Sequence, residues 1–598
     1  MSARSWSLVV LLPLVAGCGD GDEDRGTVET VCEPKVQALP TPIRHTPRWA
    51  FQPWISKDIS DGPDTYAFVD GFISRDIPVG VVVLDSPWET NYNTLIPSPT
   101  RYPEFEKMVA DMKDRDVRVV LWTTQMVNYN SFDLEPGGDV YDGAAENLQP
   151  GLDCGFFIED GDPFAWWKGQ GAAVDFFNPR AAEWWHRQQK PLLDMGVSGF
   201  KLDFGEEYIP LATVQTAAGE ISRQEYSERY YEDFLTYGQA TAGLDEFLTM
   251  VRPYDESYGF PGRFFARKEH APVAWVGDNR RDWVGLTDAL DHIFRSAKAG
   301  YVVVGSDLGG YLNVNDLNVL EDVPFSQTTF ARWTGVSAMT PFMQLHGRAN
   351  LAPWTVEERV DETVRLYRYW ATLHREMADY WYSLAESAYA GDSVPLQPQG
   401  NEASWPGDYR YQIGDAFLVA PILDDSGVRD VALPSGARWL DWWELGADPV
   451  DAGTTLSAYD VGTRERIPLF LREGAIVPLR ASGELTGFGA KASDDEPMVL
   501  VWPAAAKSTF TQFERDGQQT TISAEGNAVM LSRVVEPLVA AIRVAQAPGG
   551  VSVAGKALSA VSDRAAVSSA GGYYFEAARK LAFVAVPVSD AQTTISLK

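Results

Sequence analysis

The sequence predicts an α/β protein: a (β/α)8 TIM barrel followed by two C-terminal all-β, sandwich-like domains. Between about residues 46 and 385, short apolar strand-like runs alternate with amphipathic helical segments, as in a parallel sheet covered by helices on both faces. Eight candidate strands favour a closed barrel over an open sheet. Beyond residue 385, Gly and Pro turns separate short alternating runs, which indicates β-sandwiches at about 386–482 and 483–598.

Within the barrel segment (46–385), strands are expected near Trp49, Val82, Val119, Lys201, Phe265, Trp275, Val303 and Met343. Helical spacing is shown by four apolar residues at i, i+3, i+4 and i+7, which are Phe105, Met108, Val109 and Met112. Asn178-Pro179 predicts a capped helix start, and Gly196 predicts the end of that helix. The stretch 129–171 is too long for a simple loop, so we expect an insertion on the functional rim of the barrel.

The N-terminus carries a short apolar run, Trp6 to Val15, preceded by Arg4. This run is too short to span a membrane and is typical of a signal peptide over residues 1–17. The small residues directly before Cys18 resemble a bacterial lipobox, which implies cleavage there and a lipid on the Cys18 thiol. An ordinary signal peptide is the alternative. We therefore expect a lipid-anchored protein of the bacterial cell envelope, with residues 18–45 as a tether and no other membrane contact.

The composition of the 598 residues excludes one class of partner. There are 50 Lys and Arg against 83 Asp and Glu, a formal charge of −33, so the surface repels phosphate backbones and nucleic-acid binding is not expected. The 45% hydrophobic share is that of a globular protein. With the Cys18 thiol lipidated, Cys32 and Cys154 are the remaining thiols, and an extracytoplasmic compartment permits a disulfide between them.

Four predicted strands end in an aspartate, and these are Asp85, Asp203, Asp278 and Asp307. The carboxyl ends of barrel strands converge on one mouth, where catalytic groups lie. Four carboxylates at one opening repel each other, so they are rarely kept for packing. Two chemistries use such a cluster: metal binding, and glycoside cleavage by a carboxylate pair. A magnesium enzyme with Asp85, Asp203 and Asp307 as ligands therefore stays open as an alternative.

Neighbouring residues indicate different roles for two of these carboxylates. Lys201 and Asp203 share a face of one strand, and a nearby cation favours the ionised form that a nucleophile needs. Asp278 lies between Trp275 and Trp283, where apolar surroundings and negative charge would raise its pKa, as suits a proton donor. The competing interpretations are a buried Lys201–Asp203 ion pair and a helix N-cap at Asp278.

At these residues the sequence resembles glycoside hydrolase family 31, the retaining α-glycosidases. The resemblance extends from about Arg48 to Leu479. Its motifs are Gly199-Phe-Lys-Leu-Asp-Phe-Gly-Glu206, Trp275-Val-Gly-Asp-Asn279, Ser306-Asp-Leu-Gly-Gly310, Leu345-His-Gly347 and, in the β region, Phe417-Leu-Val-Ala-Pro421.

The resemblance implies that Asp203 is the nucleophile and Asp278 the general acid/base. It also implies that the terminal sugar is bound by Asp85, Trp122, Trp167, Lys201, Trp275, Arg267, Asp307 and His346. The implied reaction is a double displacement through a covalent glycosyl-enzyme, with net retention and without a metal or organic cofactor.

Two departures from the family pattern leave the sugar open. Family members usually carry a β-sandwich before the barrel, where this sequence shows only the predicted tether. The nucleophile strand is closer to α-xylosidase-like and sulfoquinovosidase-like branches than to many α-glucosidases, but Ser86-Pro-Trp-Glu89 stands where a sulfonate clamp is expected. We expect an exo-α-glycosidase acting on an α-xyloside or α-glucoside. The alternatives are an α-galactosidase, a transglycosylase, or a non-catalytic glycan-binding lipoprotein.

Overall fold

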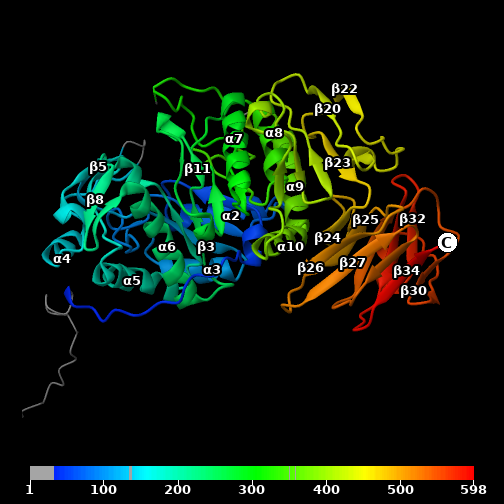
Figure 1. Cartoon of the computed structure of the whole chain (residues 1–598), viewed down its shortest axis with the longest axis horizontal. Helices are drawn as coiled ribbons and strands as arrows, with labels where there is room; N and C mark the ends of the chain where they lie inside the picture. Colours follow the sequence, from blue (N-terminus) through cyan, green and yellow to red (C-terminus); the bar gives the residue numbers. More distant parts are fainter. Residues whose placement is uncertain (1–31, 134–137, 319, 349, 357) are drawn as a thin grey trace, which may run out of the picture.

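The computed structural model describes residues 32–133, 138–318, 320–348, 350–356 and 358–598. The predicted signal peptide, Cys18 and the first part of the predicted tether lie outside these residues. An α/β barrel forms the N-terminal part of the described chain, and β-sheets form the C-terminal part (Figure 1).

The barrel has eight parallel strand positions. They are β1 (Trp54–Lys57), β2 (Val81–Leu84), β3 (Arg118–Thr123), β7 (Gly199–Leu202), β10 (Leu248–Val251), β13 (Val273–Trp275), β14 (Val304–Gly305) with β15 (Asp307–Leu308), and β16 (Gln344–Leu345). The seventh position is split at Ser306: β14 pairs with β13, and β15 pairs with β16. Because β16 also pairs with β1, the ring is closed. This confirms the predicted barrel.

Two strand positions predicted from the sequence are wrong. Trp49 lies in the short 3-10 helix η1 (Arg48–Phe51), and the first barrel strand begins at Trp54, on which Trp49 stacks. Phe265 follows β12 (Arg263–Phe264), which pairs with β11 (Tyr254–Asp255) outside the barrel. The fifth barrel strand is β10. The apolar side chain of Phe265 packs against Phe204 and does not belong to the barrel sheet.

Helices follow the strands and cover the outside of the barrel. They are α2 (Gly62–Ile73), α3 (Phe105–Lys113), α5 (Pro179–Asp194), α6 (Arg223–Ala242), α7 (Trp283–Ala299), α8 (Gln327–Ala338), α9 (Val360–Glu376) and α10 (Ala378–Tyr389). The four apolar residues predicted to share one face of α3 are all buried. The side chain of Asn178 caps α5 as predicted, and Gly196 follows its end with φ 96°.

Loops after three barrel strands build the rim of the barrel. After β3, the antiparallel strands β4 (Met126–Ser131), β6 (Gly169–Ala173) and β5 (Phe164–Trp166) form a small sheet with α4 (Leu148–Asp153) beside it. After β7 comes the hairpin β8 (Thr213–Thr216) and β9 (Gly219–Ser222), and after β10 the pair β11–β12. The β4–β6–β5 sheet and the β8–β9 hairpin form one end of the molecule in Figure 1, whereas β11 lies beside α7.

The C-terminal region is all-β. A proximal sheet contains β17 (Leu396–Pro398), β18 (Tyr411–Ile413), β19 (Phe417–Val419), β23 (Leu469–Arg472) and β21 (Trp439–Asp441), beside the pair β20 (Val428–Ala432) and β22 (Thr455–Asp460). One distal sheet contains β24 (Ile476–Ala481), β25 (Glu496–Val501), β29 (Leu538–Arg543), β33 (Leu581–Val586) and β32 (Tyr573–Glu576). The other contains β26 (Ser508–Phe513), β27 (Gln519–Glu525), β28 (Ala528–Leu531), β34 (Thr593–Leu597), β30 (Val551–Val553) and β31 (Lys556–Ala557).

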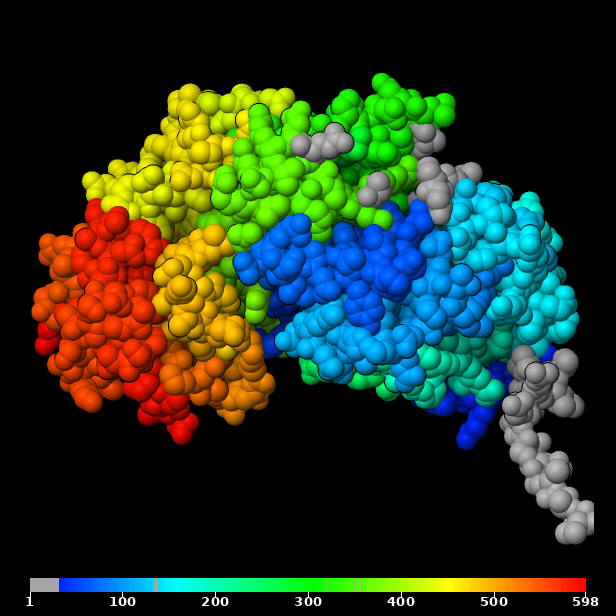
Figure 2. All heavy atoms as spheres, turned by 180° about the vertical axis from the view of Figure 1, so that it is seen from behind, coloured from blue at the N-terminus to red at the C-terminus, as the bar shows by residue number. Residues whose placement is uncertain are grey.

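These sheets lie beside the barrel, at the opposite end of the molecule from the β3 insertion (Figure 2). The predicted boundary after residue 482 falls behind β24, a strand that pairs with β25 in the distal sheet. The sheet that begins with β24 therefore starts a few residues before that boundary.

Residues 32–45, expected as a tether, lie against the barrel. The backbone of Ile43 exchanges hydrogen bonds with the side chain of Gln239 on α6, and His45 bonds Asp245 and Glu386. Cys32 forms a disulfide with Cys154, which follows α4. None of the described helices is long and apolar enough to cross a lipid bilayer.

We predict that reducing the disulfide lowers the apparent melting temperature. The bond joins residues 122 positions apart, and closing a loop of that length restricts the unfolded chain by up to about 5 kcal/mol. Melting with and without reductant tests this, with the variant Cys154→Ser as the reference that does not respond to reductant. Equal melting temperatures for protein whose intact mass shows the disulfide formed would contradict the prediction.

Candidate active site

Asp203 follows β7 directly and accepts hydrogen bonds from three sides. Its Oδ2 accepts from the Trp122 indole at 3.0 Å, and its Oδ1 accepts from the backbone N–H of Phe204 at 2.9 Å and from Arg252 Nε at 3.0 Å. Burial alone would raise the pKa of Asp203, but Arg252 and Lys201 hold this pKa below its ordinary value. Asp203 is therefore held as a carboxylate at the barrel mouth.

Asp278, three residues after the end of β13, has the opposite protonation preference. Its Oδ1 accepts from Arg252 Nη2 at 3.1 Å, and its Oδ2 lies 2.9 Å from the Tyr258 hydroxyl. Burial raises the pKa of Asp278 to about 6, with Arg252 opposing the rise and the negative charge of Asp203 adding to it. One carboxyl group has a lowered pKa and the other a raised pKa, and both bond one guanidinium. This arrangement suits one group to act as the charged partner and the other as the proton donor.

Arg252 connects the two carboxyl groups. It follows β10, its side chain is fully buried, and it bonds Asp203, Asp278 and Asp255. Gly277 makes this arrangement fit. With φ 84°, it brings its backbone so close that a Cβ there would lie 2.4 Å from Asp255 Oδ2 and 2.6 Å from Arg252 Nη1.

A second charged group lies beside the pair. Lys201 Nζ donates to Asp85 Oδ2 at 2.7 Å and lies 3.4 Å from His346 Nδ1. His346 Nε2 lies 2.7 Å from Asp58 Oδ1, and its Nδ1 lies 3.3 Å from Asp307 Oδ2. Burial and Lys201 would lower the pKa of His346, but Asp58 and Asp307 raise it to about 10. The ring is therefore an imidazolium that donates from both nitrogens.

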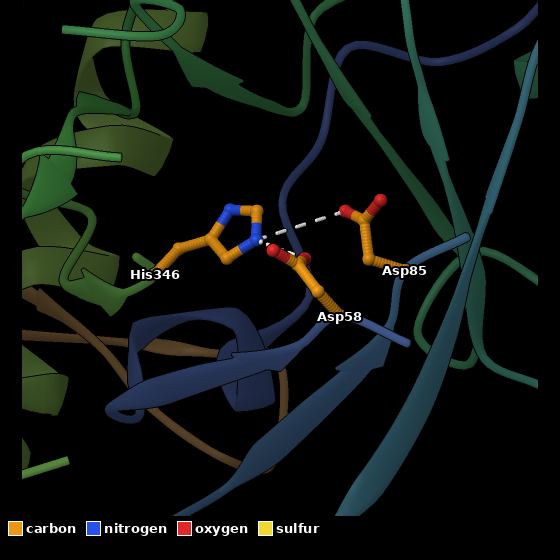
Figure 3. A group of neighbouring side chains, drawn as sticks. All are labelled: Asp58, Asp85 and His346. Carbon is orange, nitrogen blue, oxygen red and sulfur yellow. Dashed lines mark hydrogen bonds and ion pairs between the residues drawn. The ribbon is translucent and has the colours of Figure 1, made fainter. Parts of the chain in front are cut away.

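Asp58, Asp85 and His346 also have the spacing of a metal site, since each offers a donor atom within 4.8 Å of the others (Figure 3). The charges do not fit a divalent cation. A protonated His346 has no lone pair to offer a metal, and the ammonium of Lys201 already bonds Asp85. The magnesium alternative of Asp85, Asp203 and Asp307 also has protein cations at its proposed ligands, because Lys201 bonds Asp85 and Arg252 bonds Asp203.

The predicted tryptophans take different places. Trp122 is buried and donates to Asp203. Trp275 is fully buried, with Lys201 and Arg252 both over its ring, at 5.1 and 4.8 Å from the centroid. Trp167, from the insertion after β3, is partly buried and packs against Tyr208, with ring centroids 5.0 Å apart. Trp167, Tyr208 and Phe260 thus form an aromatic wall beside Asp203 and Asp278.

Arg267 does not join the other predicted site residues. Its side chain is 58% exposed and pairs with Glu228 of α6 at 2.6 Å. The arginine that reaches the carboxyl groups is Arg252. The structure therefore corrects the expectation that Arg267 lines the sugar pocket.

Sequence reasoning missed three residues of this group: Arg252, Asp58 and Tyr258. The signal for the first two was present, because each directly follows a barrel strand, β10 or β1. This signal was not used because the strands near Trp49 and Phe265 were predicted at the wrong positions. Tyr258 lies in an irregular loop, and no spacing in the sequence links it to Asp278.

Family models match most of the chain. The model described as "Glycosyl hydrolases family 31 TIM-barrel domain" matches residues 43–384, and the one described as "Glycosyl hydrolase family 31 C-terminal domain" matches residues 393–477. Together they cover the barrel and the proximal sheet.

Curated relatives include α-glucosidase 2 of Bacillus thermoamyloliquefaciens, 25% identical over 75% of this chain and 54% of the relative. An α-xylosidase of Lactiplantibacillus pentosus is 26% identical over 66% of this chain and 50% of the relative. The chain thus spans about half the length of these relatives.

Among solved structures, the cycloalternan-forming enzyme of Listeria monocytogenes, in complex with a pentasaccharide substrate, matches with a TM-score of 0.76 at 20% identity. The match covers 93% of this chain and 55% of that one. A dextranase of Flavobacterium johnsoniae complexed with isomaltotriose has the same TM-score at 17% identity, over 93% and 71% of the two chains. These structures share the fold of this chain.

We predict that Gly277→Ala lowers kcat/KM by at least about 100-fold, because displacing catalytic groups by on the order of 1 Å costs that much. The new Cβ would push apart the Arg252–Asp255 pair. The matched control is Gly436→Ala, since Gly436 has φ 96° and a Cβ there would have no atom of the described residues within 4 Å. Equal activity of the two variants against a reference glycoside would contradict the prediction.

Proposed function

The chain belongs to glycoside hydrolase family 31, and from this premise we propose that it is a retaining exo-α-glycosidase that removes a terminal α-linked sugar. The observation that carries the proposal is the single guanidinium of Arg252, which bonds one oxygen of Asp203 and one of Asp278. Adjacent nitrogens of one planar group keep the carboxyl groups close, which favours the retaining separation of about 5–5.5 Å over the wider inverting one.

In the first step, Asp203 attacks the anomeric carbon while Asp278 protonates the departing oxygen. The bond from the anomeric carbon to that oxygen breaks, and a bond to an oxygen of Asp203 forms. Arg252 and Trp122 hold Asp203 ionised and in place before the attack. The raised pKa of Asp278 keeps its proton available.

In the second step, Asp278, now a carboxylate, takes a proton from water. The water oxygen attacks the anomeric carbon, and the bond to Asp203 breaks. Two inversions give net retention, and both side chains return to their starting protonation states. Hydrolysis therefore needs no further catalytic group.

The exo mode is supported by burial. The side chains of Asp203 and Asp278 are only 11% and 14% exposed, and an enclosed pair suits the end of a sugar chain better than its middle. Lys201, Asp85 and His346 offer donors and acceptors for the hydroxyls of a terminal sugar. We propose an α-glucoside or α-xyloside, the bonds named for two curated relatives. An α-galactoside, or transfer to a sugar acceptor, is the alternative.

A non-catalytic glycan-binding role is less consistent with the site. Binding alone would not require one buried carboxyl group with a lowered pKa beside another with a raised pKa. Groups perturbed in opposite directions are typical of catalytic sites. We also propose the location expected from the N-terminus, a lipid anchor at Cys18 in the bacterial cell envelope.

We predict a bell-shaped pH dependence of kcat/KM. Asp278 must be protonated, so activity falls as the pH rises through about 6. Asp203 must be ionised, and because its pKa is lowered, the acidic limb lies below the ordinary value of 3.8. Rates on an aryl α-glycoside across pH 3 to 9, on the order of one point per half unit, measure the basic limb and the start of the acidic limb. A rate that is flat through pH 6 to 8 would contradict the assignment of Asp278.

We predict that a 5-fluoro α-glycosyl fluoride labels the peptide that contains Asp203. The slow second step lets the covalent intermediate accumulate, and peptide mass spectrometry locates it. Asp203→Ala should abolish both labelling and turnover of aryl α-glycosides, whereas Asp114→Ala, an exposed aspartate after α3, should change neither. Label on any other peptide would refute the role of Asp203.

A further inference from the structure

The loop after β10 holds Asp278 at three points. Ser257 accepts from the backbone N–H of Asp278 at 3.1 Å and donates to Asp255 Oδ1 at 2.6 Å. The Tyr258 hydroxyl lies 2.9 Å from Asp278 Oδ2. Through Asp255, the same loop also holds Arg252, which bonds Asp278 Oδ1. One loop therefore fixes the backbone and both carboxyl oxygens of Asp278.

The partners of Asp278 determine which of its oxygens carries the proton. A guanidinium has donors only and stays charged, so Oδ1, which faces Arg252, must accept. The proton of neutral Asp278 is therefore on Oδ2, the oxygen beside Tyr258. The Tyr258 hydroxyl donates to Oδ2, which keeps acceptor capacity when it is protonated, so the proton on Oδ2 must face away from Tyr258.

The backbone of Tyr258 supports a functional origin for this contact. Its φ is 58° and its ψ is 21°, a left-handed conformation that non-glycine residues rarely adopt. Such conformations persist where surrounding contacts hold them, and they cluster at functional sites. Here Ser257, the residue before Tyr258, is held by its hydrogen bond to the backbone of Asp278, and Gly259 follows with φ 69°.

We propose that Tyr258 is a positioning residue for the acid/base, which directs the proton on Asp278 Oδ2 toward the departing oxygen and stabilises the carboxylate that remains. This inference rests on the proposed function. In the first step the proton passes from Oδ2 to the departing oxygen, the O–H bonding pair stays on Oδ2, and the Tyr258 hydroxyl donates to the carboxylate that results. In the second step Oδ2 takes a proton from water, and the Tyr258 hydroxyl remains a donor to Oδ2.

The sign of the pH effect follows from the groups that face Asp278. These are Arg252 and Tyr258 from the β10 side, Asp203 and Lys201 from β7, Tyr208 from the segment after it, and Asp307 from β15. Among them Tyr258 donates a neutral hydrogen bond to the ionised form of Asp278, which favours that form. Removing the hydroxyl therefore raises the pKa of Asp278, and the basic limb moves to higher pH.

The test is Tyr258→Phe, which removes only the hydroxyl and keeps the ring and Cβ. Its matched control is Tyr254→Phe, because Tyr254 lies in the same loop and its hydroxyl bonds Glu256, not Asp278. Each enzyme is assayed on two substrates of the sugar that the wild type accepts: a glycosyl fluoride, which needs little acid assistance, and an alkyl glycoside, which needs it fully.

We expect Tyr258→Phe to lose roughly 10- to 100-fold in kcat/KM on the alkyl glycoside, the value of a hydrogen bond to a charged group. We expect little change on the fluoride, and a basic limb displaced to higher pH. Tyr254→Phe should match the wild type in both respects.

Two results would overturn the inference. One is an equal loss on both substrates, which indicates a structural role; the other is an unchanged alkyl glycoside rate with an unmoved basic limb. Failure of the proposed function is distinct, since the wild type itself would then turn over neither substrate.

Discussion

The buried guanidinium of Arg252 is the interaction on which the active site depends. One positive charge without solvent exposure bonds three carboxyl groups, of Asp203, Asp255 and Asp278. Removing such a charge from water is costly unless partners surround it, and three carboxylates around one cation could not all stay ionised. The conflict is resolved by dividing the protonation states: Asp203 keeps its charge, and Asp278 holds a proton up to a pH of about 6.

A second cationic centre also contacts the indole ring of Trp275. Lys201 lies over this ring, as Arg252 does, but bonds Asp85 and contacts the imidazolium of His346. Both groups of charges therefore lie beside the same apolar ring. The first contains Asp203 and Asp278, the proposed reacting pair, and the second contains the donors and acceptors that we propose bind the sugar hydroxyls.

The sequence was sufficient for the fold class and for predicting that Asp203, Asp278 and most of the second group lie together, because apolar barrel strands that end in aspartate place those side chains at one mouth. It was insufficient where a strand is short. The four-residue β10 was overlooked, so Arg252 was missed and Arg267, which pairs with Glu228 on the outside, took its place. Likewise, a first strand expected near Trp49 hid Asp58 at the end of β1. Tyr258 depends on the path of an irregular loop, which no periodicity records.

The division between strand ends and loops also bears on which bond is cleaved. Asp203, Asp278 and the group around Lys201 come from the ends of barrel strands or the residues that follow them. Beside them lies an aromatic wall of Trp167, Tyr208 and Phe260, from loops after β3, β7 and β10. Such rings favour the apolar face of a sugar. Strand ends are fixed by pairing on both sides, whereas loops tolerate insertion. For the proposed double displacement, we therefore expect the loops, and not Asp203 and Asp278, to set the choice of the group beyond the terminal sugar.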